Sequence, residues 1–416
     1  MIGELRFGVA IVVFAAGCNA PSDGGPPFGP REMEVLRSLS PLGSMPGAPG
    51  NAFADDPRAA DLGERLFFDA GLSEAGRVSC ATCHAPERWF ADGRPRSIGL
   101  SEGARNAPSL LGAPWAPFLS WDGRKDSVWS QALGAIEAVD EHGFTRLGVA
   151  HRIARAHRRA YEAAFGVLPD LSDRTRFPQQ GRPVPGDDRH PHDVAWTRMT
   201  PSDRGAIDRI FVHAGKSIEA YLRRFEPGPA PFDRYVAALD EGDPSGGGHL
   251  SAGAVRGLRA FIGDGRCVLC HHGPLLSDHE FHNVGPPPAF GAPEADPGWE
   301  VGAAAAQRDP FRCGSRASDA DDCPALRFLP ARTTDRLGAF RTPSLRDVAE
   351  TAPYMHGGQL AKLEDVIDFY RTLPGEPAVG RRDPLLERLD RSVATDDLLA
   401  FLHALTGPAP VAGPPR

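Results

Sequence analysis

Two copies of a Cys-x-x-Cys-His pentapeptide are the residues in this sequence whose types and spacing predict a specific chemistry. Cys80, Cys83 and His84 form the first copy, and Cys267, Cys270 and His271 form the second. The two thiols of such a motif can form thioethers with the vinyl groups of a haem, and the adjacent histidine can ligate its iron. Zinc-binding pairs are usually spaced differently, and no βαβ pattern surrounds either motif, as a thioredoxin-like dithiol would require. The sequence therefore predicts two covalently bound c-type haems.

An apolar run near the start of the chain predicts export. Residues 7–17 are too few to span a bilayer, and the run ends in Ala-Ala-Gly immediately before Cys18. This ending is similar to a bacterial lipoprotein cleavage site, after which the cysteine is acylated. An ordinary secretory signal is the alternative, and it would also export the chain. We therefore expect a periplasmic protein, with a lipid anchor to the membrane through Cys18 in the lipoprotein case.

Two of the seven cysteines, Cys313 and Cys323, remain after this assignment. An exported compartment allows them to pair as a local disulfide. Two free thiols are the alternative, and neither cysteine is assigned a catalytic role.

The charge of the chain bears on its partners. The formal net charge is -8, whereas proteins that bind nucleic acid present basic surfaces to the phosphates. We therefore expect no nucleic acid among the partners.

The two motifs lie too far apart for one small cytochrome fold, so each is expected to have its own domain. The fold class predicted is all-α, with two cytochrome-c-like domains and long irregular loops. The predicted division is 1–18 signal peptide, 19–52 tether rich in Pro and Gly, 53–230 N-terminal haem domain, and 231–416 C-terminal haem domain.

Apolar residues at helical spacing indicate the main elements of both domains. Helices are predicted over 62–67, 147–165, 207–225, 258–262 and 363–370, with a last helix from an N-cap at Thr395 to Gly407. Strand signals are weak throughout. Segments 167–195 and 284–336 are rich in Pro, Gly and Asp, and are predicted to be loops long enough to be insertions.

Six further motifs occur in order around the two haem motifs. They are Leu-Phe-Phe-Asp at 66–69, Arg-Asn-Ala-Pro-Ser-Leu at 105–110, Trp-Asp-Gly-Arg at 121–124, Phe-His-Asn at 281–283, Arg-Thr-Pro-Ser-Leu-Arg at 341–346 and Thr-Ala-Pro-Tyr-Met-His-Gly-Gly at 351–358. With them, the chain from about Leu62 to Gly407 resembles the bacterial di-haem cytochrome c peroxidase family, including its MauG-like branch.

The resemblance implies that the haem on His84 is the peroxidatic one. Family members that need reductive activation place a histidine in the loop after the first motif, on the far side of the iron. Leu100 occupies that position here and cannot ligate iron, so we expect an open site even in the oxidised protein. Gln131 and Glu141 match the family's distal glutamine and glutamate, with Glu137 the alternative if the register slips. A carboxylate can carry a proton between the peroxide oxygens while an amide orients them. Without the resemblance, Glu141 reads as a solvated acid.

The resemblance also places Trp121 between the haems, as a carrier of electrons or of a radical; a buried aromatic residue is the simpler interpretation, and both can hold. The side chain of Asn106, with the carbonyls of Thr351 and Pro353, would form a calcium site between the haems. Hard oxygen ligands suit Ca²⁺.

The haem on His271 would be the entry point for electrons. Peroxidases of the family place methionine opposite this histidine, whereas the MauG-like branch places tyrosine, and the matching position here is Tyr370. Tyr370 as a plain core residue, with Met355 as the ligand, is the alternative. His356 and Arg341 would line the propionate side of this haem.

The implied activity is reduction of hydrogen peroxide at the first haem, with electrons relayed through the second from a small cytochrome c or a cupredoxin. One alternative is MauG-like oxidation of a protein substrate. A non-enzymatic electron-transfer cytochrome with two six-coordinate irons is another, and a peroxide or gas sensor is a weaker third.

Overall fold

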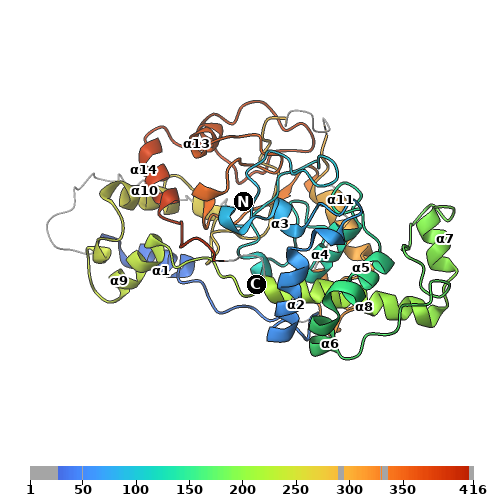
Figure 1. Cartoon of the computed structure of the whole chain (residues 1–416). Helices are drawn as coiled ribbons and strands as arrows, with labels where there is room; N and C mark the ends of the chain where they lie inside the picture. Colours follow the sequence, from blue (N-terminus) through green and yellow to red (C-terminus); the bar gives the residue numbers. More distant parts are fainter. Residues whose placement is uncertain (1–26, 49, 289–294, 328, 330–335, 412–416) are drawn as a thin grey trace, which may run out of the picture.

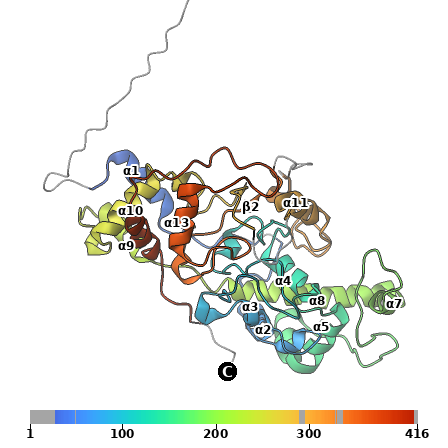
Figure 2. The same cartoon turned by 90° about the horizontal axis from the view of Figure 1, so that it is seen from above.

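The computed structural model describes residues 27–48, 50–288, 295–327, 329 and 336–411. The predicted signal peptide and Cys18 lie outside the described residues. The described chain is rich in helix and forms two lobes, one from each half of the sequence, which Figures 1 and 2 show side by side in two views at right angles. Within these residues, no helix has the length and apolar character needed to cross a membrane.

The main helices of the N-terminal half surround one apolar core. They are α2 (Pro57–Phe67), α4 (Val128–Glu137), α5 (Arg146–Arg152), α6 (Arg158–Phe165) and α8 (Pro201–Leu222). The C-terminal half has a second core, built by α9 (Pro231–Asp240), α10 (Ala252–Ile262), α13 (Leu363–Thr372) and α14 (Thr395–His403). Two separate cores agree with the prediction of two helical domains.

Each half contains a helix that precedes its haem motif and crosses a later helix at a glycine. A Cβ added to Gly63 of α2 would lie 1.8 Å from the carbonyl oxygen of Ser217 in α8, and a Cβ added to Gly257 of α10 would lie 1.9 Å from that of Asp397 in α14. Only glycine permits backbones to approach so closely. The same type of close helix crossing therefore precedes each haem motif.

Local sequence explains where the predicted helices begin and end. The Oγ1 of Thr200 accepts a hydrogen bond from the amide of Asp203 at 3.1 Å and caps α8. The helix predicted over 147–165 forms, but a π-helical turn at Ile153–His157 separates α5 from α6. In the last helix, Thr395 is the first helical residue rather than the N-cap, and the helix ends at His403.

Strand is confined to two short pieces within the described chain. β1 (Phe281–His282) pairs antiparallel with β2 (Phe340–Arg341), and Phe281 lies opposite Arg341. This pairing confirms the weak strand signals and brings the Phe-His-Asn motif beside Arg341.

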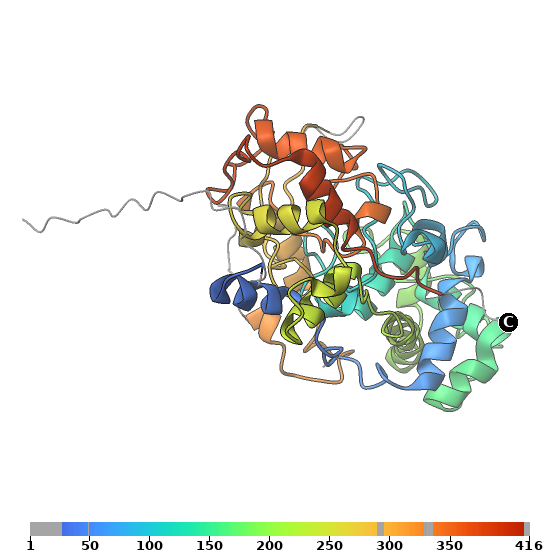
Figure 3. The same ribbon diagram turned by 90° about the vertical axis from the view of Figure 1, so that its left-hand side faces the viewer.

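The segment 19–52, predicted to be a tether rich in Pro and Gly, contains a helix that packs on the folded chain. α1 (Pro30–Leu39) buries Leu36 and Leu39, with the preceding Phe28, in the core of the C-terminal half. Figure 3 views the molecule from this side. This helix could not be predicted because two leucines three apart in a single ten-residue helix are too few for a clear periodicity.

The segment 284–336 lies in the predicted C-terminal domain, but part of it packs against the N-terminal half. This segment contains α11 (Trp299–Arg308) and α12 (Pro324–Arg327) rather than loop alone, and Phe311 enters the core of the N-terminal half. The other predicted loop, 167–195, leads into α7 (Pro191–Thr197). The predicted disulfide between Cys313 and Cys323 is confirmed and lies in the same insertion.

Candidate haem and peroxide site

The first haem motif is held by a short helix and a tight turn. α3 (Cys80–Cys83) carries both cysteines, and the turn after it places Trp89 and Phe90 at positive φ. The turn brings the carbonyl of Phe90 to 3.0 Å from Nδ1 of His84. This hydrogen bond fixes the proton on Nδ1 and leaves Nε2 as the free ligand atom. Burial lowers the pKa of His84, which favours the neutral imidazole that a metal requires.

The second motif repeats this arrangement. Nδ1 of His271 lies 2.9 Å from the carbonyl of Leu276, which again has positive φ, and burial again lowers the pKa of the histidine. None of the four motif cysteines forms a disulfide. Both motifs therefore offer two thiols and one oriented imidazole, the donor set of a c-type haem.

Arg341 provides an independent test of whether a haem fits the second motif. Its Nε is buried without a hydrogen-bond partner, its Nη1 donates to the carbonyl of Thr342 at 3.4 Å, and no carboxylate among the described residues pairs with it. Burial lowers the pKa of Arg341 to about 10. Nearby, Nδ1 of His279 is also buried without a partner, and burial followed by the charge of Arg341 lowers the pKa of His279 to about 4. A buried cation without a counter-ion is costly, so the site fits an anionic group such as a haem propionate.

His356 lies close to Arg341 in the fold. Its ring stacks on Phe340, the neighbour of Arg341, with centroids 3.6 Å apart. Burial lowers the pKa of His356 to about 4. The placement of both side chains is compatible with the predicted propionate side of the second haem.

Glu141 lies against the first motif. Burial raises the pKa of the Cys80 thiol to about 12, and the nearby charge of Glu141 is the next contribution. Burial also raises the pKa of Glu141 itself, against the opposing charges of Arg124 and Lys125. The amide of Leu100 donates to the carbonyl of Glu141 at 3.0 Å. The leucine and the acid therefore lie side by side next to the first motif.

Glu137, the alternative acid, is engaged elsewhere. Its carboxylate pairs with the buried Arg146 at 2.9 Å. Gln131, on the same helix α4, accepts a hydrogen bond from Oγ of Ser120 at 2.7 Å. This contact ties Gln131 to the residue before Trp121. Within the described chain, Gln131 and Glu141 share no hydrogen bond.

Trp121 connects the two halves of the chain. Its Nε1 donates to the carbonyl of Asn106 at 3.0 Å, and its own carbonyl accepts from the amide of Arg341 at 2.8 Å. The amide of Asn106 in turn donates to the carbonyl of His356 at 2.8 Å. The tryptophan thus lies between the segment of Asn106 in the first half and strand β2 in the second.

Asn106 is the one residue predicted to bind calcium through its side chain. Asn106 is buried, and its Nδ2 donates to the carbonyl of Arg94 at 2.7 Å. Its backbone contact with His356 brings it to the segment that contains Thr351 and Pro353, the other two predicted calcium ligands.

Tyr370 lies in the second half on α13, packed against the core of that half. Burial raises its pKa, and the nearby charges of Cys270 and Cys267 raise it further. The phenol is therefore close to the second motif, where the resemblance implies an iron ligand. Met355 lies in a turn at positive φ.

Sequence reasoning assigned no role to His282, which the structure places between two acids. Its Nδ1 lies 2.7 Å from Asp383 and its Nε2 2.9 Å from Asp278. Burial opposes the charge, but these carboxylates and Cys270 raise the pKa of His282 to about 11. The spacing of Asp278 and His282 was visible in the sequence, whereas Asp383 lies too far along the chain to be linked to them.

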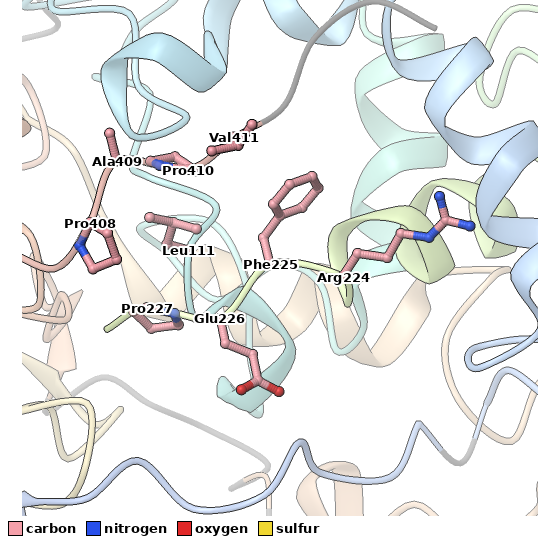
Figure 4. A pocket seen from close by; sticks show the side chains of 9 residues that line it. All are labelled: Leu111, Arg224, Phe225, Glu226, Pro227, Pro408, Ala409, Pro410 and Val411. Carbon is pink, nitrogen blue, oxygen red and sulfur yellow. The ribbon is translucent and has the colours of Figure 1, made fainter. Parts of the chain in front are cut away.

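A separate pocket lies where the connection between the halves meets the end of the described chain. It is lined by Leu111, Arg224, Phe225, Glu226, Pro227, Pro408, Ala409, Pro410 and Val411 (Figure 4). No predicted site residue lines this pocket, so it is not part of the haem sites.

Fold and site together define a two-domain helical protein with a pair of c-type haem motifs. A family model described as "Di-haem cytochrome c peroxidase" matches residues 57–241. Cytochrome-c peroxidase IdrP1 of Denitromonas iodatirespirans is 32% identical over 89% of this chain and 88% of that protein. MauG, the methylamine utilization protein of Methylorubrum extorquens, is 30% identical over 84% of this chain and 78% of that protein.

Solved structures agree. The di-haem peroxidase BthA from Burkholderia thailandensis has a TM-score of 0.62 at 25% identity, covering 86% of this chain and 88% of its own. A MauG-like protein associated with microbial copper homeostasis has a TM-score of 0.59 at 26% identity, covering 88% and 95%. The chain belongs to the di-haem cytochrome c peroxidase family, which includes MauG, and membership implies two haems.

Proposed function

We propose that this protein reduces hydrogen peroxide at its first haem motif and belongs to the MauG-like branch of its family. It is an oxidoreductase of the peroxidase type. One observation carries the proposal: the carboxylate of Glu141 lies beside Cys80, next to Leu100 rather than an iron-ligating histidine.

A haem held at each motif by its two cysteines and its histidine would supply redox-active iron, for peroxide reduction at the first motif and for electron transfer at the second. Glu141 accepts a proton from the first oxygen of peroxide and returns it to the leaving oxygen. Gln131, oriented by Ser120, positions the peroxide through its amide. Two electrons and two protons convert one hydrogen peroxide to two waters.

Tyr370 supports assignment to the MauG-like branch. A phenolate is a hard, anionic ligand that favours Fe(III) and would lower the potential of the second haem relative to methionine. Its position beside Cys267 and Cys270 allows this role. The same residue favours a second candidate function, oxidation of a protein substrate instead of a small redox protein. Turnover with cytochrome c or a cupredoxin would support peroxide removal, and failure of every such donor would favour the protein substrate.

Export to the periplasm and acylation of Cys18 are also part of the proposal. The apolar run at 7–17 supports both, and the Cys313–Cys323 disulfide is of a kind that persists in oxidising compartments. Calcium bound near Asn106 is proposed on the family resemblance and on the burial of that side chain.

Stopped-flow absorption of the fully oxidised holoprotein, mixed with stoichiometric peroxide, tests the main proposal. We expect a rapid change in the haem spectrum without prior reduction, because Leu100 leaves the first site open. A change only after reduction would mean that another sixth ligand closes the site. No change in either state would leave an electron-transfer cytochrome.

A further inference from the structure

Helix α11 comes from the second half of the sequence but packs on the turn formed by residues 121–125, here called the Trp121 turn (Figure 1). A Cβ added to Gly302 would lie 1.7 Å from the carbonyl oxygen of Asp122, and one added to Gly123 would lie 2.3 Å from the ring of Trp299. The turn and the helix therefore have no space between them. Any displacement of α11 would displace the turn.

An acidic residue lies at each end of α11 and binds this region. Before the helix, Asp296 forms a two-point ion pair with Arg105 at 2.9 and 2.8 Å, and Arg105 also pairs with Asp122 at 2.7 Å. After the helix, Asp309 is buried and pairs with Lys125. The turn is therefore held at both ends by residues of the insertion.

Asp309 also reaches the helix that carries Gln131. Its Oδ2 accepts hydrogen bonds from Nζ of Lys125 and, at 2.8 Å, from Oγ of Ser130, the residue before Gln131. Its Oδ1 accepts from the amide of Phe311 at 2.8 Å. One buried carboxylate thus joins the end of the Trp121 turn to helix α4.

The chain after Asp309 is fastened to the N-terminal half as well. Asp126 accepts from the amide of Cys313 at 2.7 Å, and Cys313 is disulfide-bonded to Cys323. Between these cysteines, Asp319 pairs with the buried Lys216 at 2.8 Å. Asp319 is exposed, whereas Asp309 is buried, but it likewise pairs with a lysine of the N-terminal half. Its hydrogen bonds reach Lys216 and the amide of Ala52, not the Trp121 turn or α4, so it provides a control for the loss of an insertion carboxylate.

We propose that Asp309 is a positioning residue for the peroxide side of the first haem site: it fixes Lys125 and helix α4 against the Trp121 turn and neutralises Lys125 close to Glu141. This inference rests on the proposed peroxidase function. It assigns to the insertion of the second half a role in the chemistry of the first.

The charge balance around Glu141 gives the inference a measurable sign. Arg124, Lys125 and Asp140 face this acid, as do the thiols of the first motif, which become uncharged thioethers when haem is attached. Asp309→Asn would leave the cation of Lys125 unneutralised, and the pKa of Glu141 would fall. Lys125→Gln would remove the cation, and the pKa of Glu141 would rise.

The test measures the second-order rate constant of the oxidised holoprotein with peroxide as a function of pH. The rate should fall at low pH as Glu141 becomes protonated, and this decrease is the acid limb of the profile. We expect Asp309→Asn to lower the pH-independent plateau rate by about tenfold to a hundredfold, and to move the acid limb to lower pH. Lys125→Gln should move the acid limb to higher pH. Asp319→Asn should leave the plateau and the limb as in the wild type. Haem content and thermal unfolding establish that each variant is folded.

Equal behaviour of Asp309→Asn and Asp319→Asn would overturn the inference. So would a lower rate without a shift of the acid limb, which would indicate a merely structural role. If Asp309→Asn does not fold, Lys125→Gln serves as the test. An acid limb in Lys125→Gln at the same pH as in the wild type would then overturn the inference. A wild-type protein that does not react would overturn the proposed function and this inference with it, whereas a reactive wild type confines failure to the inference.

Discussion

Each haem histidine is oriented by a backbone carbonyl that a left-handed residue turns back toward the ring. Phe90 and Leu276, the two residues that supply the carbonyls, both have positive φ. Such a conformation is uncommon for bulky side chains. The strain is compensated because the hydrogen bond fixes the tautomer needed to ligate iron.

Glu141→Gln tests the acid–base role at the scale of one residue. The amide keeps the size of the side chain but cannot accept a proton, so we expect the peroxide reaction to slow by about 10²- to 10⁴-fold. Both haems should remain attached. Asp140→Asn, the neighbouring acid, is the control and should change the rate far less. Stopped-flow absorption measures both, and an unchanged rate in Glu141→Gln would remove this residue from the mechanism.

Tyr370→Met tests the proposed ligand of the second haem. A neutral thioether stabilises Fe(II) better than a phenolate does, so the potential of this haem should rise by a substantial part of the roughly 0.8 V range that axial ligands span. Spectroelectrochemical titration measures the shift. Tyr370→Phe, which keeps the ring but offers no ligand atom, separates ligation from packing. A potential unchanged in both variants would show that Tyr370 is a core residue only.

Local motifs supplied the candidate site residues, but not the contacts that hold them. The two pentapeptides and the ordered motifs led to Glu141, with Glu137 as the alternative, and the structure pairs Glu137 with Arg146. Asp309 could not be found in this way because its partner Lys125 lies 184 residues earlier. Contacts at such separations leave no periodic signal in a single sequence.

At the scale of helices, predictability followed the length of the apolar pattern. α8 has many buried positions at helical spacing and was predicted, whereas α1 and α11 are each ten residues long and lie in segments rich in Pro, Gly or Asp. For such helices, tertiary packing supplies most of the stability. Their existence depends on a surface that the sequence does not show.

Leu36→Ala tests whether α1 is part of the folded core. Leu36 is fully buried against the C-terminal half, and its truncation should lower the free energy of unfolding by about 2–5 kcal/mol. Glu34→Ala, at an exposed position of the same helix, should have little effect. Denaturant unfolding of the full chain compares the two. Equal stability of both variants would restore the interpretation of this segment as a tether.

At the scale of the whole molecule, α8 joins the N-terminal segment to the first domain through a buried acid. Glu219 accepts a hydrogen bond from Nδ2 of Asn51 at 2.7 Å, and burial raises its pKa from 4.5 to about 7. Between these values the folded state holds more protons than the unfolded state. The stabilisation from this group is therefore complete below about pH 4.5, and is lost as pH rises through about 7.

Glu219→Gln should remove this dependence. The amide can still accept the hydrogen bond from Asn51 but does not titrate, so the variant should lose less stability between pH 4.5 and 7 than the wild type, by on the order of 2 kcal/mol. Thermal and denaturant unfolding at several pH values measure the difference. Glu241→Gln, on the surface, is the control. Parallel curves for wild type and Glu219→Gln would contradict the expected coupling.

The packing of α1 determines which half of the molecule would lie near a membrane anchor at Cys18. Phe28 is buried in the C-terminal half, and the ten residues from Cys18 to Phe28 can extend over roughly 35 Å at most. An acylated Cys18 would therefore hold the C-terminal half within this distance of the bilayer. Under the proposed acylation of Cys18, a donor confined to the membrane surface would lie nearer to the C-terminal half, to which the second motif belongs, than to the N-terminal half.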